Sequence, residues 1–218
     1  MLMSKMIVVS LMLLIAGMAA LAQEQKIAEQ PKLDVSKMHD ALPDKDYTAR
    51  TSDTSFVAPD DERVQRLEIV IPNVTPKQLW QAVSTSEGLR SFVAPVTEVE
   101  MKTGGRYYTN YNASAKIGDP GTIYNTVLAY IPLEMVAIHV KLGTQIFPAS
   151  VANADQLSAI MQIKDVGNGN VRVSEIMTGW QSGEDWDKVY KFFQTGNAYV
   201  LGQLYKRFAV GPRQWAGK

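Results

Sequence analysis

The residues that could do chemistry in this chain are few and lie far apart in the sequence. There are no cysteines and only two histidines, His39 and His139. The lack of cysteine excludes disulfides, thiol catalysis and thiolate metal sites. Two distant histidines make a poor metal site. The sequence therefore predicts no metal and no cofactor, and it offers no constellation of catalytic residues.

His139 lies in a strand-like run, so alternation indicates whether it could serve as a general base. The even-numbered positions from 136 to 142 are all apolar, whereas the odd-numbered ones include His139 and Lys141. Successive side chains of a strand point to opposite faces. We therefore expect His139 to point away from the core. We interpret Arg172 and Glu175, in a later hairpin, as part of a solvated face as well.

Gly104 and Gly105 could suggest a phosphate-binding loop. They precede a predicted strand rather than a helix, and so lack the helix dipole and amide groups that hold a phosphate. The pair predicts a tight turn or a bulge.

Asn197 is a polar residue on the apolar stripe of the last predicted helix. It follows Phe193 by four residues and precedes Val200 by three. An amide that faces the interior costs free energy unless it finds a partner. Two interpretations remain open. Asn197 either supplies the hydrogen-bonding group of a binding pocket or bonds a backbone carbonyl or a buried water.

The elements that must position these residues begin with a strand over residues 64–71. Thr75, Pro76 and Gln78 then form a capping box that starts a helix. Ser84 and Glu87 have the same spacing and predict a second short helix.

A series of strands follows, and the short turns between them predict an antiparallel meander. The expected strands cover residues 106–111, 122–131, 135–142, 157–166 and 171–177. The last two form a hairpin across the Gly-Asn-Gly-Asn turn at residues 167–170.

The final helix is predicted to begin at a Ser182 cap and to end before Gly211-Pro212. Nine large apolar residues between Trp186 and Phe208 recur at spacings of three and four. These positions share one face of a helix about 25 residues long. Because burial of each contributes roughly 1.5–3 kcal/mol, together they can hold the helix against the sheet.

Composition and the N-terminus bound the class of protein. The 218 residues carry 22 basic and 22 acidic side chains, and 46% are hydrophobic. This balance argues for a packed core and against a nucleic-acid partner. Lys5, the apolar run over residues 6–22 and the exit Ala20-Leu21-Ala22 are typical of a secretory signal peptide cleaved after Ala22.

The alternative is an uncleaved anchor, for which the run is short against a bilayer span of roughly 20 residues. We expect a periplasmic or secreted protein that does not remain at the membrane. The predicted organisation is a signal peptide at 1–22, a polar linker or loosely ordered arm at 23–62, a folded domain at 63–212 and a tail at 213–218.

The order of these elements resembles the helix-grip superfamily, which includes START, Bet v 1-like and polyketide cyclase proteins (SRPBCC). Local motifs most resemble the group related to the C-terminal domain of the Hsp90 ATPase activator. The similar segments are residues 79–83, 88–95, 103–107, 131–134 and 183–204. Phe92 stands where that group usually has tryptophan, and Gly196-Asn197 stands where it often has Gly-Trp. The resemblance implies an α+β fold, in which a curved antiparallel sheet wraps around a long C-terminal helix.

A helix across a curved sheet leaves an apolar space, which is a usual place for a ligand. The predicted partner is a small hydrophobic molecule: a lipid, a polyketide or an aromatic compound. The alternatives are a cyclase-like or hydrolase-like enzyme and a co-chaperone-like protein-interaction module. Each candidate lining residue could instead be ordinary core. These candidates are Trp80, Phe92, Tyr108, Tyr124, Met161, Phe193 and Asn197.

Overall fold

The computed structural model describes residues 45–144 and 146–215. The predicted signal peptide and the first part of the predicted arm, residues 23–44, lie outside the described residues. In the part of the chain that is described, no helix has the length and hydropathy needed to cross a bilayer.

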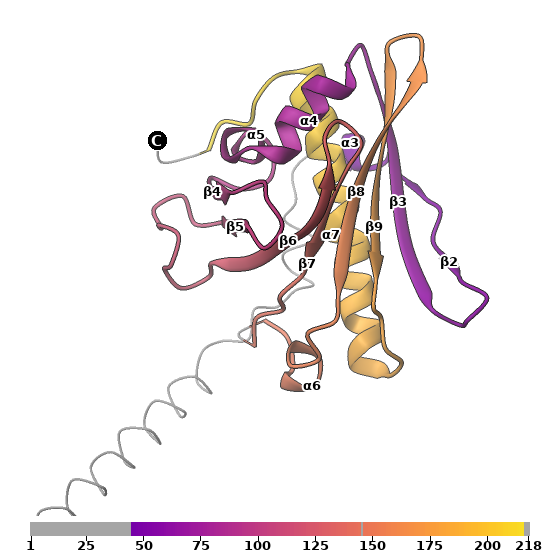
Figure 1. Ribbon diagram of the computed structural model, residues 1–218, viewed down its shortest axis with the longest axis vertical. Coiled ribbons are helices and arrows are strands. Elements are labelled where there is room, and N and C mark those ends of the chain that lie inside the picture. Colours follow the sequence, from indigo (N-terminus) through magenta and orange to yellow (C-terminus); the bar gives the residue numbers. More distant parts are fainter. Residues whose placement is uncertain (1–44, 145, 216–218) are drawn as a thin grey trace, which may run out of the picture. The chain divides into compact units, whose positions relative to one another are not determined.

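The described residues build a nine-stranded sheet in which every paired strand is antiparallel to its neighbour (Figure 1). The strand order is β1-β3-β9-β8-β7-β6-β5-β4, and β2 also pairs with β3. The predicted meander is confirmed from β5 to β9. Strand β4, which was not predicted, pairs with β5, and β3 pairs with β9. The bounds are β1 Ser52–Asp53, β2 Phe56–Val57, β3 Arg63–Pro72, β4 Val96–Val99, β5 Arg106–Asn110, β6 Ile123–Ile131, β7 Met135–His139, β8 Ser158–Gly167 and β9 Asn170–Thr178.

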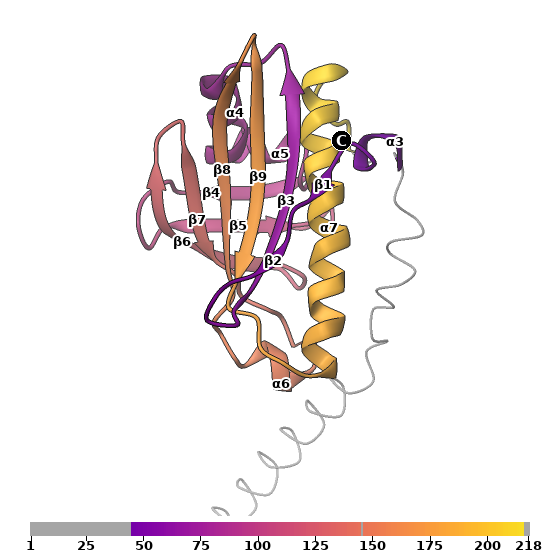
Figure 2. The same cartoon turned by 90° about the vertical axis from the view of Figure 1, so that its right-hand side faces the viewer.

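The sheet is strongly curved. Strands β3, β8 and β9 run nearly along the final helix, whereas β4 and β5 run across it (Figure 2). Gly104 has a φ of 75°, which favours glycine, and lies in the turn between β4 and β5. The turn predicted from Gly104-Gly105 is therefore present.

Two short helices follow β3. Helix α4 (Pro76–Ser84) has the predicted capping box, in which the Gln78 amide donates to Thr75 Oγ1 at 3.3 Å and the Thr75 amide donates to Gln78 Oε1 at 2.9 Å. Helix α5 (Ser86–Arg90) is capped by Thr85, whose Oγ1 accepts from the Gly88 amide at 2.9 Å. The Ser84 cap predicted for α5 is wrong, because α4 continues through Ser84 and the extended residue is Thr85.

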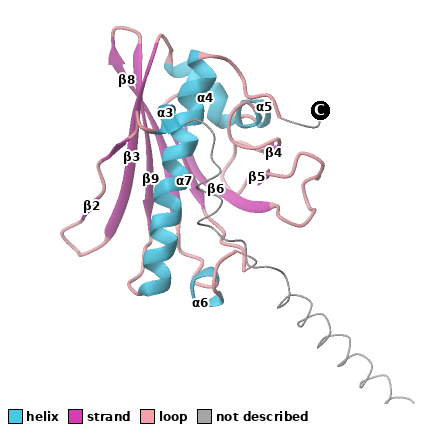
Figure 3. Ribbon diagram, turned by 180° about the vertical axis from the view of Figure 1, so that it is seen from behind, coloured by secondary structure: helices cyan, strands magenta, loops and turns pink. Residues whose placement is uncertain are grey.

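The long helix α7 (Glu184–Ala209) lies along one side of the sheet (Figure 3). Its N-cap is Gly183, which has no side chain to cap it, so the predicted Ser182 cap is wrong by one residue. Acidic residues in its first turn and Lys206 and Arg207 in its last turn complement the helix dipole.

Two hydrophobic clusters hold α7 on the sheet. The first joins the inner side chains of β3, β8 and β9 to α4, α5 and the C-terminal part of α7, through Leu201 and Leu204. The second joins Trp180, Trp186 and Val189 to the short helix α6 (Ala149–Ala152). Partly buried Ile138 packs against both clusters, so the two clusters meet at this residue.

Residues 45–62 of the predicted arm are part of the fold. Strand β1 pairs with β3, and the short helix α3 (Lys45–Thr48) packs on α7. The Tyr47 and Tyr205 rings lie 5.8 Å apart, and Thr51 Oγ1 donates to the Ala198 carbonyl at 3.4 Å. Two-residue strands carry no periodicity, so no local sequence pattern predicts this docking.

Candidate functional site

The inner face of the sheet can be read from its register, because directly opposed residues of neighbouring strands point to the same side. One such row runs across five strands: Leu67, Glu175, Met161, Val136 and Tyr130. Leu67, Met161 and Val136 belong to the cluster that contains residues of α4, α5 and α7. This row therefore faces those helices, and Glu175 is its one charged member.

Glu175 contradicts the sequence prediction of a solvated face. It shares its face of β9 with Val171, Val173 and Met177, all of which are buried. Its Oε2 is buried and has no hydrogen-bond partner, although the residue as a whole is only half-buried. Alternation along β9 did carry the signal, since every second residue around Glu175 is apolar; the charge of the residue led to the wrong interpretation.

Burial raises the pKa of Glu175 from its ordinary 4.5 to about 8. A carboxylate withdrawn from water is costly unless a cation or several donors compensate it. Among the described residues, none forms an ion pair with Glu175. Glu175 therefore holds its proton at neutral pH, and it can both donate and accept a hydrogen bond.

Tyr107 of β5 also lies within the first cluster. Its hydroxyl donates to the Val83 carbonyl of α4 at 2.8 Å. Burial, and secondarily the nearby Glu175 carboxyl, raise the pKa of Tyr107. The proton of this hydroxyl is therefore committed to Val83 and is not available to Glu175.

Asn197 connects α7 to the sheet through a polar contact. Its Nδ2 donates to Gln65 Oε1 at 3.3 Å and lies 3.1 Å from Met177 Sδ. Gln65 is fully buried and donates in turn to the Tyr190 carbonyl of α7 at 2.9 Å. The partner of Asn197 is thus a buried side-chain amide rather than the backbone carbonyl or the water that was considered from sequence.

Helix α7 is buried at both ends but not between residues 190 and 200. Gly196 lies on the same helix face as Val189 and Gln203, seven residues to either side, and these are 2% and 4% exposed. That face is buried at Val189 and Gln203, whereas Gly196 itself is half-buried. Yet a Cβ built on Gly196 would meet nothing within 4 Å. An open space therefore adjoins the middle of α7 beside this face.

Five of the seven predicted lining residues lie on the inner side. Phe92 is fully buried in the first cluster, and Trp80 packs beside it with its ring 6.3 Å from that of Tyr130. Met161 lies opposite Glu175. Phe193 belongs to an aromatic group at the other end of the helix, where its ring lies 6.0 Å from that of Trp180. Asn197 makes the contact described above.

Tyr108 and Tyr124 point away from α7, so their assignment to the lining is wrong. They are direct cross-strand partners, and their rings meet edge to face at 5.0 Å. Tyr108 alternates with Tyr107, which points inward. Two consecutive tyrosines of one strand cannot both face the same side.

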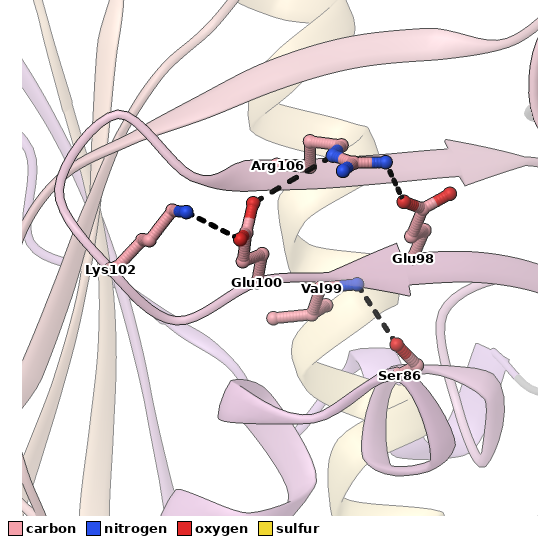
Figure 4. A network of polar contacts seen from close by, with 6 residues as sticks. All are labelled: Ser86, Glu98, Val99, Glu100, Lys102 and Arg106. Carbon is pink, nitrogen blue, oxygen red and sulfur yellow. Dashed lines mark hydrogen bonds and ion pairs between the residues drawn. The ribbon is translucent and has the colours of Figure 1, made fainter.

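The outer face of β4 and β5 also carries a charged network (Figure 4). Arg106 pairs with Glu98 and lies 3.7 Å from Glu100, which pairs with Lys102 at 2.6 Å. The Lys102 ammonium, as the largest cause, lowers the pKa of Glu100. Because the residues around Tyr108 are charged and exposed, they do not form an apolar lining.

His139 lies on the outer face of β7, as predicted. Its Nε2 is 3.1 Å from the Asp155 carbonyl oxygen. Within the described residues, no group of three or more histidine, aspartate or glutamate side chains could hold a metal ion.

A second feature is a surface groove of about 610 Å³ formed by α4, α5, the end of α7 and the C-terminal segment. Trp215 Nε1 donates to the Arg90 carbonyl at 2.6 Å, and the Arg213 amide donates to the Ser91 carbonyl at 2.9 Å. Part of the predicted tail is thus bound to α5. None of the seven predicted residues lines this groove, whose walls are Gln81, Thr85, Glu87, Gly88, Arg90, Ser91, Arg207, Pro212, Arg213 and Trp215.

The architecture is the helix-grip fold: a curved antiparallel sheet, two short helices after its first long strand, and a long C-terminal helix. A family model described as activator of Hsp90 ATPase homolog 1-like protein matches residues 73–209. The chain belongs to this family, within the superfamily that also holds ligand-binding and polyketide cyclase-like members. The sequence matches none of the curated proteins.

Solved structures share the fold at low identity. The Aha1 dimer from Colwellia psychrerythraea is 20% identical and covers 68% of this chain and 97% of its own, with a TM-score of 0.53. CalU16 from Micromonospora echinospora is 10% identical and covers 75% and 86%, with a TM-score of 0.51. DynU16, from the dynemicin biosynthetic locus, is 14% identical and covers 68% and 48%, with a TM-score of 0.52.

Proposed function

We propose that this protein is an exported binding domain that holds a small hydrophobic molecule between α7 and the inner face of the sheet. One observation carries the proposal: Gly196 lies on one face of α7 between buried Val189 and Gln203, yet open space adjoins it. Apolar spaces between elements of a rigid scaffold are the usual sites for small ligands. The ligand class follows from the walls, since the neighbouring sheet face is apolar apart from a few polar groups.

The export part of the proposal rests on residues 1–22, with their single Lys5, apolar run and Ala20-Leu21-Ala22 exit. Export also bears on the interaction alternative. An exported protein would not meet a cytosolic chaperone partner, which makes a co-chaperone-like role less suitable for this member of the family.

A cyclase-like or hydrolase-like activity would need two titratable groups that converge on the ligand. In the described part of the inner row, Glu175 is the only acid, and the hydroxyl of neighbouring Tyr107 donates to a backbone carbonyl. This arrangement supports binding over acid–base chemistry.

Titration with the neutral fluorescent probe N-phenyl-1-naphthylamine tests the proposal. The probe should bind the wild-type protein and fail to bind Gly196→Phe, in which the new ring occupies the open space. Thr195→Phe is the matched control, because Thr195 is the adjacent helical residue and is exposed. Equal binding to all three proteins, or none to the wild type, would overturn the proposed site.

A further inference from the structure

Glu175 lies close to the open space beside α7. Met177, two residues further along β9 on the same face, contacts Asn197, the neighbour of Gly196 in the helix. Two residues of a strand span about 6.6 Å. Glu175 therefore lies only two strand residues from Met177, which contacts the turn of α7 that contains Gly196.

One oxygen of the Glu175 carboxyl group, Oε2, has unused hydrogen-bonding capacity. Its Oε2 has neither water contact nor a protein partner, and its cross-strand neighbours Leu67 and Met161 offer no polar group. Buried polar atoms in folded proteins are almost always bonded, so an orphan atom at a binding site indicates a partner that arrives with the ligand. The residue as a whole is half-buried, so a molecule in the site can bond its carboxyl group once Oε2, which is covered, turns toward it.

We propose that Glu175 is the polar anchor of the site, and that the ligand is an apolar molecule bearing a hydroxyl group, either an alcohol or a phenol. This inference rests on the proposed function. A hydroxyl both donates and accepts, which matches a carboxyl group that has one acceptor and one proton to offer. A ligand carboxylate fits less well, because no described cation lies beside Glu175 to neutralise it.

The test compares two probes that differ by one hydroxyl group, naphthalene and 2-naphthol, by fluorescence titration of the full mature chain. In Glu175→Met, the affinity ratio of 2-naphthol to naphthalene should fall about tenfold, the value of one hydrogen bond to a buried carboxyl. Naphthalene should bind the variant as well as the wild type, since methionine preserves the volume. Glu175→Gln should keep the wild-type ratio, because the amide still donates and accepts.

Arg172→Met, on the exposed outer face of the same strand, is the control and should change nothing. Circular dichroism of each variant confirms that it is folded. If both probes bind and the ratio is the same in wild type and Glu175→Met, the anchor is refuted and the proposed function stands. If neither probe binds the wild type, both inferences fail.

Discussion

Glu175 of β9 lies directly opposite Met161 of β8 on the face of the sheet that α7 covers. A carboxyl group thus shares a row with apolar side chains, and one of its oxygens has no partner. Such a group lowers stability when ionised. Its retention in the core is easier to understand if it serves a ligand than if it serves the fold.

The first prediction concerns pH. The folded pKa of Glu175, about 8, lies above its ordinary value of 4.5. Between these values the folded state keeps a proton that the unfolded state has lost. The contribution of Glu175 to stability is therefore fully present below the lower value. It then falls as pH rises through the upper one, at no more than about 1.4 kcal/mol per pH unit.

Glu175→Gln should remove this contribution. The free energy of unfolding of the variant, relative to that of the wild type, should therefore increase as pH rises from about 5 to about 8. Urea unfolding of both proteins across that range measures the difference. A constant difference would mean that Glu175 does not titrate in this window. The comparison cancels the other titrating groups, apart from neighbouring Tyr107, whose raised pKa keeps it neutral throughout.

The local features of the fold could be predicted from sequence. The Thr75–Gln78 capping box and the stripe of α7 depend on residues a few positions apart, and both are present. Alternation also placed His139 correctly on the outer face. The prediction for Tyr108 and Tyr124 is wrong because aromatic character does not tell which face of a strand a residue takes, whereas inward-pointing Tyr107 fixes the direction of Tyr108.

The candidate site could be predicted only in part. The inward placement of Phe92 and Met161 could be predicted, because large apolar residues on inner strands and helices pack inward. The space beside Gly196 could not be found, because it depends on the separation of α7 from the sheet, which no local pattern encodes. The docking of α3 was missed for the same reason, since it depends on the tertiary contact at Gly202.

The second prediction compares two glycines of α7. A Cβ on Gly202 would lie 2.9 Å from the Thr48 backbone nitrogen of α3, whereas one on Gly196 would meet nothing. The free energy of unfolding of Gly202→Ala should therefore rise little or fall by about 1–3 kcal/mol through overpacking. The free energy of unfolding of Gly196→Ala should rise by up to about 1 kcal/mol, because alanine has the higher helix propensity.

Thermal unfolding of the two variants measures this difference, and limited proteolysis near Arg50 shows whether α3 detaches in Gly202→Ala. Equal stabilisation by both substitutions would contradict the close contact between α3 and α7. Both changes are the same in chemistry and lie in one helix, so each is the control for the other.

The third prediction separates inward from outward aromatic residues. Tyr108→Ala and Tyr124→Ala should leave N-phenyl-1-naphthylamine binding unchanged within a factor of about two, because both rings lie on the outer face. Phe193→Ala, on the inward side of α7, should change it. A loss of probe binding in either tyrosine variant would place the ligand on the wrong side of the sheet for the proposed site.

The last prediction concerns the Gln65–Asn197 contact. Gln65 is fully buried, donates to the Tyr190 carbonyl and accepts from Asn197. Asn197→Leu leaves the Gln65 carbonyl oxygen without its donor, which should cost about 1–3 kcal/mol. Gln65→Met also removes the bond to Tyr190 and should cost a similar amount.

Because both substitutions break the same hydrogen bond, their effects on the free energy of unfolding should not add, and the double variant should be more stable than the sum predicts. Urea unfolding of the four proteins gives the coupling. Additive effects would mean that the 3.3 Å contact between Gln65 and Asn197 contributes nothing to stability.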